Sequence, residues 1–361
     1  MSLAPLLRVD RLHHVSVVVR DLRAAARGYA EVLGIERWDV VHHTSEGLRD
    51  TAVLGCAAPF SYATATGSNP HGVRFRLVQP TGGLSTYEQF LVTRGEGVHG
   101  VCLARVDEPV FAEVRGRLGA HQVSIGQAAT VDGSVRHYHL DTRAALGGFF
   151  VEVEVPVGEE RVRVDERWDF QGQVRRPEGV GSLQDVPRIF HFGVAVHDLM
   201  ARLQAYAHLL GLTRWSFRHF GPGTVQRSTV DGEEVEHAFL LAVAAFDDVG
   251  FEVIQPTQEP THYRRHLLDV IGEGVHHLLL LPAEDEARWP AVRAWLEGLG
   301  APVAMSGEVG PTSFYYLDTR AKLGGYLVEA IVRPRDVGGD PATRREPDYT
   351  FDFGTRAPEN A

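Results

Sequence analysis

Histidine and glutamate residues recur in this chain at a spacing that suits metal sites. Three pairs are separated by the same distance (191 − 14, 276 − 99 and 329 − 152 all equal 177): His14 with His191, His99 with His276, and Glu152 with Glu329. Imidazole nitrogens and carboxylate oxygens are common ligands of divalent metals. A buried carboxylate on an apolar strand such as GGYLVEAIV is costly unless it is paired or bound to metal. These residue types therefore predict a divalent metal site in each half of the chain.

Longer segments recur around these residues. RLHHVSVVVRDL matches RIFHFGVAVHDL, LVQPT matches VIQPT, GEGVH occurs twice, and LDTRAALGGFFVEV matches LDTRAKLGGYLVEA. Four matched blocks in the same order indicate a tandem duplication. We expect a first unit at 8–156, a linker at 157–186 with a strand near 161–164, a second unit at 187–334 and a C-terminal tail at 335–361.

Each unit divides again into two similar modules. A β-branched strand holds the first histidine, and the apolar periodicity then predicts a helix over 22–33 that Asp21 caps and Gly34 ends. The second module repeats this order, with a helix at 108–118 whose expected inward residues are Val110, Phe111, Val114 and Leu118. Short strand-like runs follow each helix. The fold class is therefore α+β, with four βαβββ modules in two tandem paired units.

Strand alternation places small residues beside the first histidines. Ser16 shares a strand face with His14, and Gly193 shares one with His191, which leaves room next to each imidazole. Other histidines have no counterpart in both units, so we expect them in loops or on the surface: His42, His43, His121, His219, His262 and His266.

Composition limits the function classes. The 361 residues are 44% hydrophobic and 23% charged, and no apolar run approaches the roughly 20 residues of a membrane helix. The net charge of −11 argues against a nucleic-acid partner, and the two cysteines form no CxxC motif. We expect a cytoplasmic monomer or homodimer that acts on a small-molecule substrate, without a nucleic-acid or membrane partner.

The repeated segments resemble the vicinal oxygen chelate superfamily, which includes glyoxalase I, methylmalonyl-CoA epimerase and the extradiol dioxygenases. HHVSVVVRDL and FHFGVAVHDL, the Gln-Pro segments, GEGVHG and GEGVHH, and LGGFFVEV and LGGYLVEA carry the resemblance. Each unit resembles one epimerase subunit. The resemblance implies that each pair of modules forms a cup-shaped mixed sheet with helices outside and one divalent ion inside.

The resemblance also implies a ligand set. In the second unit it implies the ligands His191, Glu252, His276 and Glu329, for Mn, Co, Ni, Zn, Mg or Fe(II). In the first unit it implies His14, His99 and Glu152, with Arg76 at the position that corresponds to Glu252. A guanidinium has no lone pair to offer a metal. Either the first site is degenerate, or Arg76 binds a substrate carboxylate, or Arg76 pairs with Glu154 as a structural residue.

The resemblance implies an enzyme that stabilises negative charge on a substrate oxygen with its metal ion. Four protein ligands in the second unit favour an isomerase or epimerase that moves a proton next to a metal-bound carbonyl, with Glu329 or Glu252 as the catalytic base. One alternative is an Fe(II) extradiol dioxygenase, which uses two histidines and one glutamate and suits the first unit. A second is a non-catalytic binding or resistance protein, and a glutathione-linked lyase is a further possibility.

Overall fold

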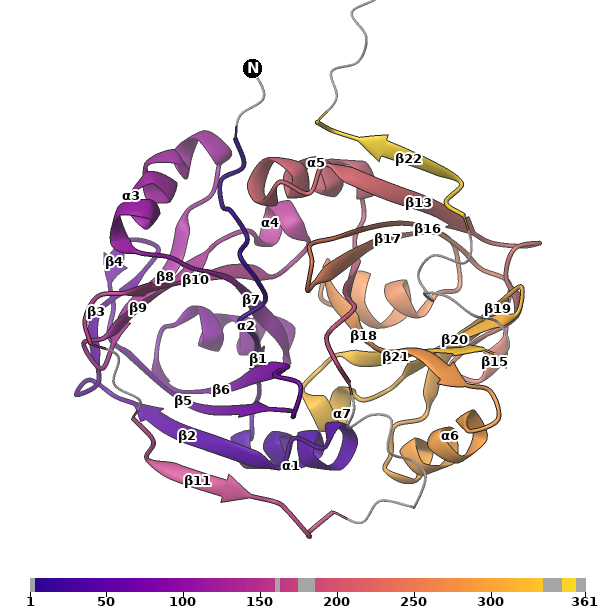
Figure 1. The fold of residues 1–361 in the computed structure, drawn as a ribbon, viewed down its shortest axis with the longest axis horizontal. Helices are drawn as coiled ribbons and strands as arrows, with labels where there is room; N and C mark the ends of the chain where they lie inside the picture. The colour runs from indigo at the N-terminus through magenta and orange to yellow at the C-terminus, as the bar shows by residue number, and fades with distance from the viewer. Residues whose placement is uncertain (1–3, 160–162, 175–185, 334–345, 355–361) are drawn as a thin grey trace, which may run out of the picture.

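The computed structural model describes residues 4–159, 163–174, 186–333 and 346–354. They form two curled sheets that lie side by side, one from each half of the chain (Figure 1). No helix among these residues has the length and apolar character needed to cross a membrane.

The first sheet has 11 strands and contains both modules of the first unit. Its strands are, in spatial order, β11 (Glu166–Asp169), β2 (Arg37–His43), β5 (Phe60–Ser68), β6 (Arg74–Gly83), β1 (His14–Val18), β7 (Gly97–Arg105), β10 (Phe150–Pro156), β9 (Val135–Leu140), β8 (Ile125–Val131), β3 (Leu48–Val53) and β4 (Cys56–Ala57). The order β1-β6-β5-β2 in one module repeats as β7-β10-β9-β8 in the other. The predicted pairing of two βαβββ modules is therefore confirmed.

The second sheet also has 11 strands and repeats this order. Its strands are β15 (Glu233–Glu234), β14 (Gln226–Val230), β19 (Val303–Val309), β20 (Thr312–Leu317), β21 (Leu327–Arg333), β18 (Gly274–Asp285), β12 (His191–Ala195), β17 (Gly250–Gln258), β16 (Ala238–Ala245), β13 (Arg214–Phe220) and β22 (Tyr349–Asp352). β11 comes from the expected linker and β22 from the expected tail, and each lies at one edge of a sheet. The strand expected near 161–164 lies partly outside the described residues.

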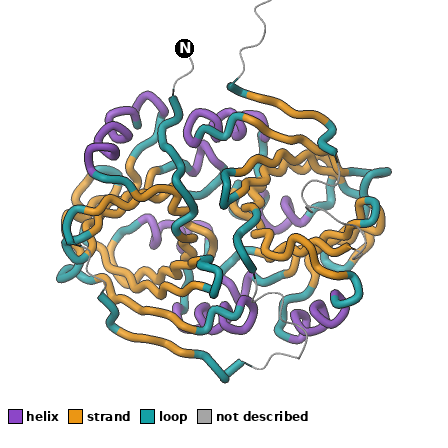
Figure 2. The backbone as a smooth tube through the Cα atoms, in the orientation of Figure 1, coloured by secondary structure: helices purple, strands orange, loops and turns teal. Residues whose placement is uncertain are grey.

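Helices lie on the outside of the sheets and within each curl (Figure 2). Those of the first unit are α1 (Leu22–Leu33), α2 (Thr86–Arg94), α3 (Glu108–Arg117) and α4 (Arg143–Leu146), and those of the second are α5 (Leu199–Leu210), α6 (Trp289–Gly298) and α7 (Arg320–Leu323). Asp21 caps α1 and Gly34 ends it, as predicted. Phe111 and Val114 face inward from α3, but Val110 is 46% exposed because it lies on the outer side. The sequence did not predict α2 or the helical turn Arg264–Leu268, which occupies the corresponding place in the second unit.

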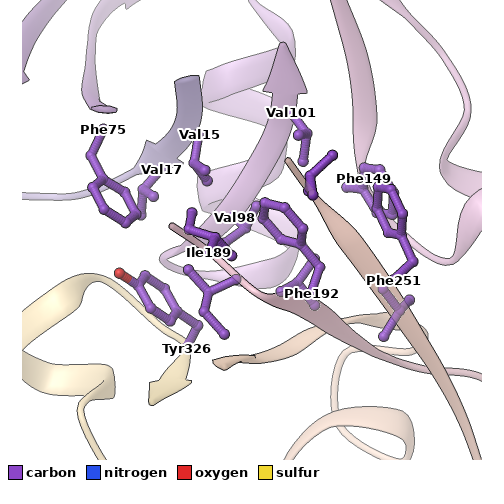
Figure 3. Packing of buried hydrophobic residues seen from close by; sticks show 14 of the residues in the cluster. Val15, Val17, Phe75, Val98, Val101, Phe149, Ile189, Phe192, Phe251 and Tyr326 are labelled. Carbon is purple, nitrogen blue, oxygen red and sulfur yellow. The ribbon is translucent and has the colours of Figure 1, made fainter. Parts of the chain in front are cut away.

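The convex faces of the two sheets share one hydrophobic core. Val15 and Phe75 of the first unit and Phe192 and Phe251 of the second belong to the same buried cluster (Figure 3). The concave faces hold two separate clusters, one for each unit. Each sheet therefore buries its outer face against helices and the other unit, and keeps its inner face for its own interior.

The units meet through repeated contacts with approximate two-fold symmetry. The Tyr29 hydroxyl on α1 donates to the Leu323 carbonyl at the end of α7, and the Tyr206 hydroxyl on α5 donates to the Leu146 carbonyl at the end of α4. The LGG segments lie at these contacts. Gly148 has a φ of 92°, and an added Cβ would overlap the Glu273 carbonyl of the other unit. The repeat of LGG therefore follows from packing between the units.

Candidate metal centre

Four side chains from four neighbouring strands meet inside the second sheet. His191 lies on β12, Glu252 on β17, His277 on β18 and Glu329 on β21, and these strands are adjacent in the order β21-β18-β12-β17. The register explains the meeting, because Gly193 of β12 lies opposite Glu252 on one side and His277 on the other. The four residues are called the His/Glu group below.

The donor atoms of the His/Glu group are close together. His191 Nε2 lies 2.9 Å from Glu329 Oε2, 3.0 Å from Glu252 Oε2 and 3.3 Å from His277 Nε2. His277 Nε2 lies 3.2 Å from Glu329 Oε2. All four residues are buried, and one donor atom from each lies within 4.8 Å of the others. This arrangement directs two nitrogens and two oxygens at one another.

The two carboxylates change the proton affinity of their neighbours. Burial alone would lower the pKa of His191, but Glu252 and Glu329 outweigh burial and raise this pKa to about 10. Burial would raise the pKa of Glu329, but His277 and His191 lower it to about 2. These shifts favour an ionised Glu329 and positive charge at His191.

The chemistry of the donor set fits a divalent metal ion. Two buried carboxylates are costly unless a cation compensates their charge, and a divalent ion supplies that compensation. Imidazole and carboxylate donors in this ratio suit Mn, Fe(II), Co, Ni and Zn, while Mg prefers the oxygens alone. An ion at this place would be held by one donor atom from each member of the His/Glu group.

The structure does not bring all four predicted ligands of the second unit together. His276 was expected in the group, but its neighbour His277 takes that place. The register between β12 and β18 shifts at Gly193, because His276 is an extra residue in a β-bulge. A bulge redirects side chains in a way that regular alternation does not predict. His276 Nε2 contacts His262 Nδ1 at 2.8 Å, and His276 Nδ1 contacts His277 Nδ1 at 3.1 Å.

A small residue makes room for His277. An added Cβ on Gly193 would overlap the His277 ring, so this position requires glycine. The first unit has the opposite arrangement, because Ser16 takes the place of Gly193 and lies opposite Gly100. Gly100 is the counterpart of His277 (277 − 177 = 100), so the first unit lacks this histidine.

The predicted ligands of the first unit surround one carboxylate. His14 Nε2 lies 3.1 Å from Glu152 Oε2, Ser16 Oγ donates to the same oxygen at 2.9 Å, and His99 Nδ1 lies 3.7 Å from Glu152 Oε1. Burial, and then the Arg76 charge, lower the pKa of His14, in contrast to the raised value at His191. His14 and Ser16 therefore satisfy Glu152 Oε2, while Glu152 Oε1 and both ring nitrogens of His99 are buried without a hydrogen-bond partner among the described residues.

Arg76 is held by the other glutamate of β10. Its Nη2 donates to Glu154 Oε1 at 2.9 Å, and its Nη1 lies 3.4 Å from His137 Nδ1. In the second unit Glu252 replaces the arginine, and Ile331 replaces Glu154 (154 + 177 = 331). The structural ion pair expected as one alternative is present, while a role for Arg76 in binding substrate stays a prediction.

Five buried histidines were not predicted from the sequence: His43, His139, His237, His262 and His277. His277 and Glu252 both lack a counterpart in the first unit. Their joint occurrence in the second unit alone was the feature of the sequence that could have identified His277. His43 and His262 were expected in loops or on the surface, but they are 8% and 1% exposed. The burial of these histidines depends on contacts between distant segments, which the sequence periodicity does not show.

Comparisons with known proteins agree on the fold. No family model matches the chain, and no curated protein matches it. A triple mutant of 4-hydroxymandelate synthase from Streptomyces coelicolor superposes with a TM-score of 0.54 and 13% identity, over 94% of this chain and 97% of that one. A likeness at this identity shows a common fold and carries no statement about substrate. The fold that the family resemblance implied is therefore confirmed.

Two further solved structures are similar at lower scores. Methylmalonyl-CoA epimerase from Mycobacterium tuberculosis matches with 24% identity and a TM-score of 0.31, over 44% of this chain and 94% of that one. A Mn(II)-bound glyoxalase from Novosphingobium aromaticivorans matches with 16% identity and a TM-score of 0.39, over 90% of this chain and 82% of that one. We draw nothing about the reaction from these two likenesses.

Proposed function

We propose that this protein is a metal-dependent enzyme whose second unit moves a proton at a carbon next to a carbonyl group of a small organic substrate. The observation that carries the proposal is the His/Glu group, with its two imidazoles and two carboxylates. A divalent ion held there would polarise the carbonyl oxygen and lower the cost of removing the neighbouring proton. Such a reaction is an isomerisation or epimerisation and consumes no oxidant.

The donor count distinguishes this reaction from its main alternative. An Fe(II) dioxygenase site with two histidines and one carboxylate keeps three positions for substrate and oxygen. The second unit offers a fourth donor, Glu252, which takes one of these positions. In the first unit Gly100 replaces the second histidine and Arg76 replaces the fourth donor, so that unit gives less support to either reaction.

Glu252 is the residue we assign as the catalytic base. Glu329 contacts both His191 and His277, whereas Glu252 forms its ion pair with His191. A carboxylate with fewer partners moves more readily toward a substrate proton. In the proposed reaction Glu252 takes the proton from the carbon, and the carboxylic acid or water returns a proton to that carbon.

Two measurements on the same samples test the proposal. The purified protein is supplied with Mn²⁺, Co²⁺ or Fe²⁺ and with 2-methyl thioesters, 2-oxo acids and catechols. We expect deuterium from D₂O to enter the recovered substrate without oxygen consumption. Oxygen uptake with a ring-opened catechol product would contradict the proposal and favour the dioxygenase.

A variant then tests the assignment of the base. Glu252→Gln keeps the size of the side chain and removes its ability to accept the proton, so we expect deuterium exchange to fall by about 100-fold or more. His42→Phe, a change at an exposed position of the first unit, serves as the control and leaves exchange unchanged. Undiminished exchange in Glu252→Gln would transfer the role of base to Glu329.

A further inference from the structure

Three other side chains of the second unit form a compact cluster outside the His/Glu group. They are Asp231, His262 and His266, and one donor atom from each lies within 4.8 Å of the others. His262 and His266 are four residues apart on one helical turn, which places both rings on the same side. The two rings stack with their centroids 4.1 Å apart. Asp231 follows β14 in the turn that leads to β15.

His262 supplies a buried nitrogen that lacks a partner. The residue is 1% exposed, and its Nδ1 contacts His276 Nε2 at 2.8 Å. Its Nε2 has no hydrogen-bond partner among the described residues. Buried polar atoms without a protein partner are rare in native structures, and such an atom often contacts an ion or a water molecule. The orientation of His262 therefore leaves one ring nitrogen available for a ligand.

The other two members connect this nitrogen to the surface. His266 Nε2 lies 3.1 Å from Asp231 Oδ2, and their side chains are 33% and 40% exposed. Arg265 Nη1 lies 3.7 Å from the same Asp231 oxygen, with 45% of its side chain exposed. A pair of exposed charges at this distance contributes little to stability, so it does not prevent Asp231 from binding a cation. The cluster thus has a buried end and a solvent-accessible end.

The first unit shows that the fold does not require these residues. At the corresponding positions it has Leu54, Thr86 and Phe90 (231 − 177 = 54, 262 − 176 = 86 and 266 − 176 = 90). Leu54 and Asp231 share the same unusual backbone, with φ of 50° and 53°. The turn therefore has the same backbone without a carboxylate, and the first unit places a helix, α2, at the corresponding position without an imidazole. These two elements thus do not require the three polar residues of the second unit.

We propose that Asp231, His262 and His266 form a second divalent-metal site that prefers zinc. Two imidazoles and one carboxylate are a common zinc ligand set, and the accessible end leaves a fourth position for water. The site joins the helical turn over the interior of the second sheet to the β14–β15 turn. Through His276, the buried end of this site also contacts His277 of the His/Glu group, so the two sites share one chain of contacts.

Metal stoichiometry tests this site without any assay of activity. The metal-free protein is dialysed against Zn²⁺, and zinc per chain is measured by elemental analysis. We expect two ions in the wild type and one in His266→Phe, which copies Phe90 of the first unit. Asp231→Asn, which removes the charge and keeps the shape, is expected to weaken the same ion by at least 10-fold.

Two controls separate this site from the His/Glu group and from surface histidines. His277→Asn is expected to lose the other ion and retain the one held by Asp231, His262 and His266. His42 forms a similar exposed pair with Glu166 at 3.0 Å but belongs to none of the groups of close metal-ligating atoms among the described residues, so His42→Phe keeps both ions. A wild type that binds no zinc, or a His266→Phe variant that binds as much zinc as the wild type, would overturn the proposal.

Discussion

His276 and His277 are neighbours in the chain but have different surroundings. His277 Nε2 reaches Glu329, while His276 contacts the outer ring nitrogen of His277 and the ring of His262. A residue that contacts the outer nitrogen of a ligand orients that ligand and tunes its affinity for metal. The repeat GEGVH identified the strand β18. Because the repeat contains only the histidine common to both units, it led to the prediction of His276 and not of His277, which only the second unit has.

A matched pair of substitutions distinguishes these roles. We expect His276→Asn to weaken metal binding at the His/Glu group by roughly 10–100-fold, as for other residues that orient a ligand, and His277→Asn to weaken it by more than about 100-fold. The measurement is calorimetric titration of the metal-free protein with Mn²⁺, with circular dichroism to check folding. A larger loss in His276→Asn than in His277→Asn would restore His276 as the ligand.

At the scale of elements, the sequence predicted the strands that carry the site better than the directions of their side chains. The structure brings the predicted residues His191, Glu252 and Glu329 together, and each lies on a regular strand, where alternation holds. The bulge on β18 and the helix inside each curl were not predicted, because both depend on contacts between distant strands. The two units also differ in a pair of residues that lie opposite each other on neighbouring strands. The pair is Gly193 and His277 in the second unit, and Ser16 and Gly100 in the first.

This difference predicts how a binding site could be built in the first unit. The triple variant Ser16→Gly, Arg76→Glu and Gly100→His copies the second unit onto β1, β6 and β7. We expect it to bind one more Mn²⁺ per chain than the wild type, because Glu152 and His14 are already in place. Gly100→His alone should bind no additional ion, since Arg76 still repels it and Ser16 still occupies the space. Equal metal content in the triple variant and the wild type would show that other residues close the first site.

In the whole molecule, the two units share one hydrophobic core, so we expect them to unfold together. Their convex faces share a core, and Phe149 of the first unit packs against Phe251 of the second with ring centroids 6.2 Å apart. Much of the sequence repeat serves this interface, since the LGG segments and the two tyrosines of α1 and α5 all lie there. The tandem duplication could be recognised from the sequence, but the packing of one unit on the other could not, because periodicity does not identify which surface a strand buries.

Truncation of Phe149 should therefore destabilise both units together. Phe149→Ala removes a fully buried ring, and substitutions of this kind cost about 3–5 kcal/mol. We expect one unfolding transition in calorimetry, shifted to lower temperature, for both the wild type and the variant. Leu54→Ala, at a position that is 63% exposed, is the control and should change stability by less than about 0.5 kcal/mol. Two separate transitions would show that the units fold independently.

The location of the bound ion decides whether the His/Glu group is the metal site of this protein. Crystals of the protein grown with Mn²⁺ would be measured on both sides of the manganese absorption edge, which places the ion without assumptions about ligands. We predict a manganese peak among His191, Glu252, His277 and Glu329, and none beside His14 and Glu152. A peak in the first unit, or no peak within the His/Glu group, would contradict the assignment of the metal site to the second unit.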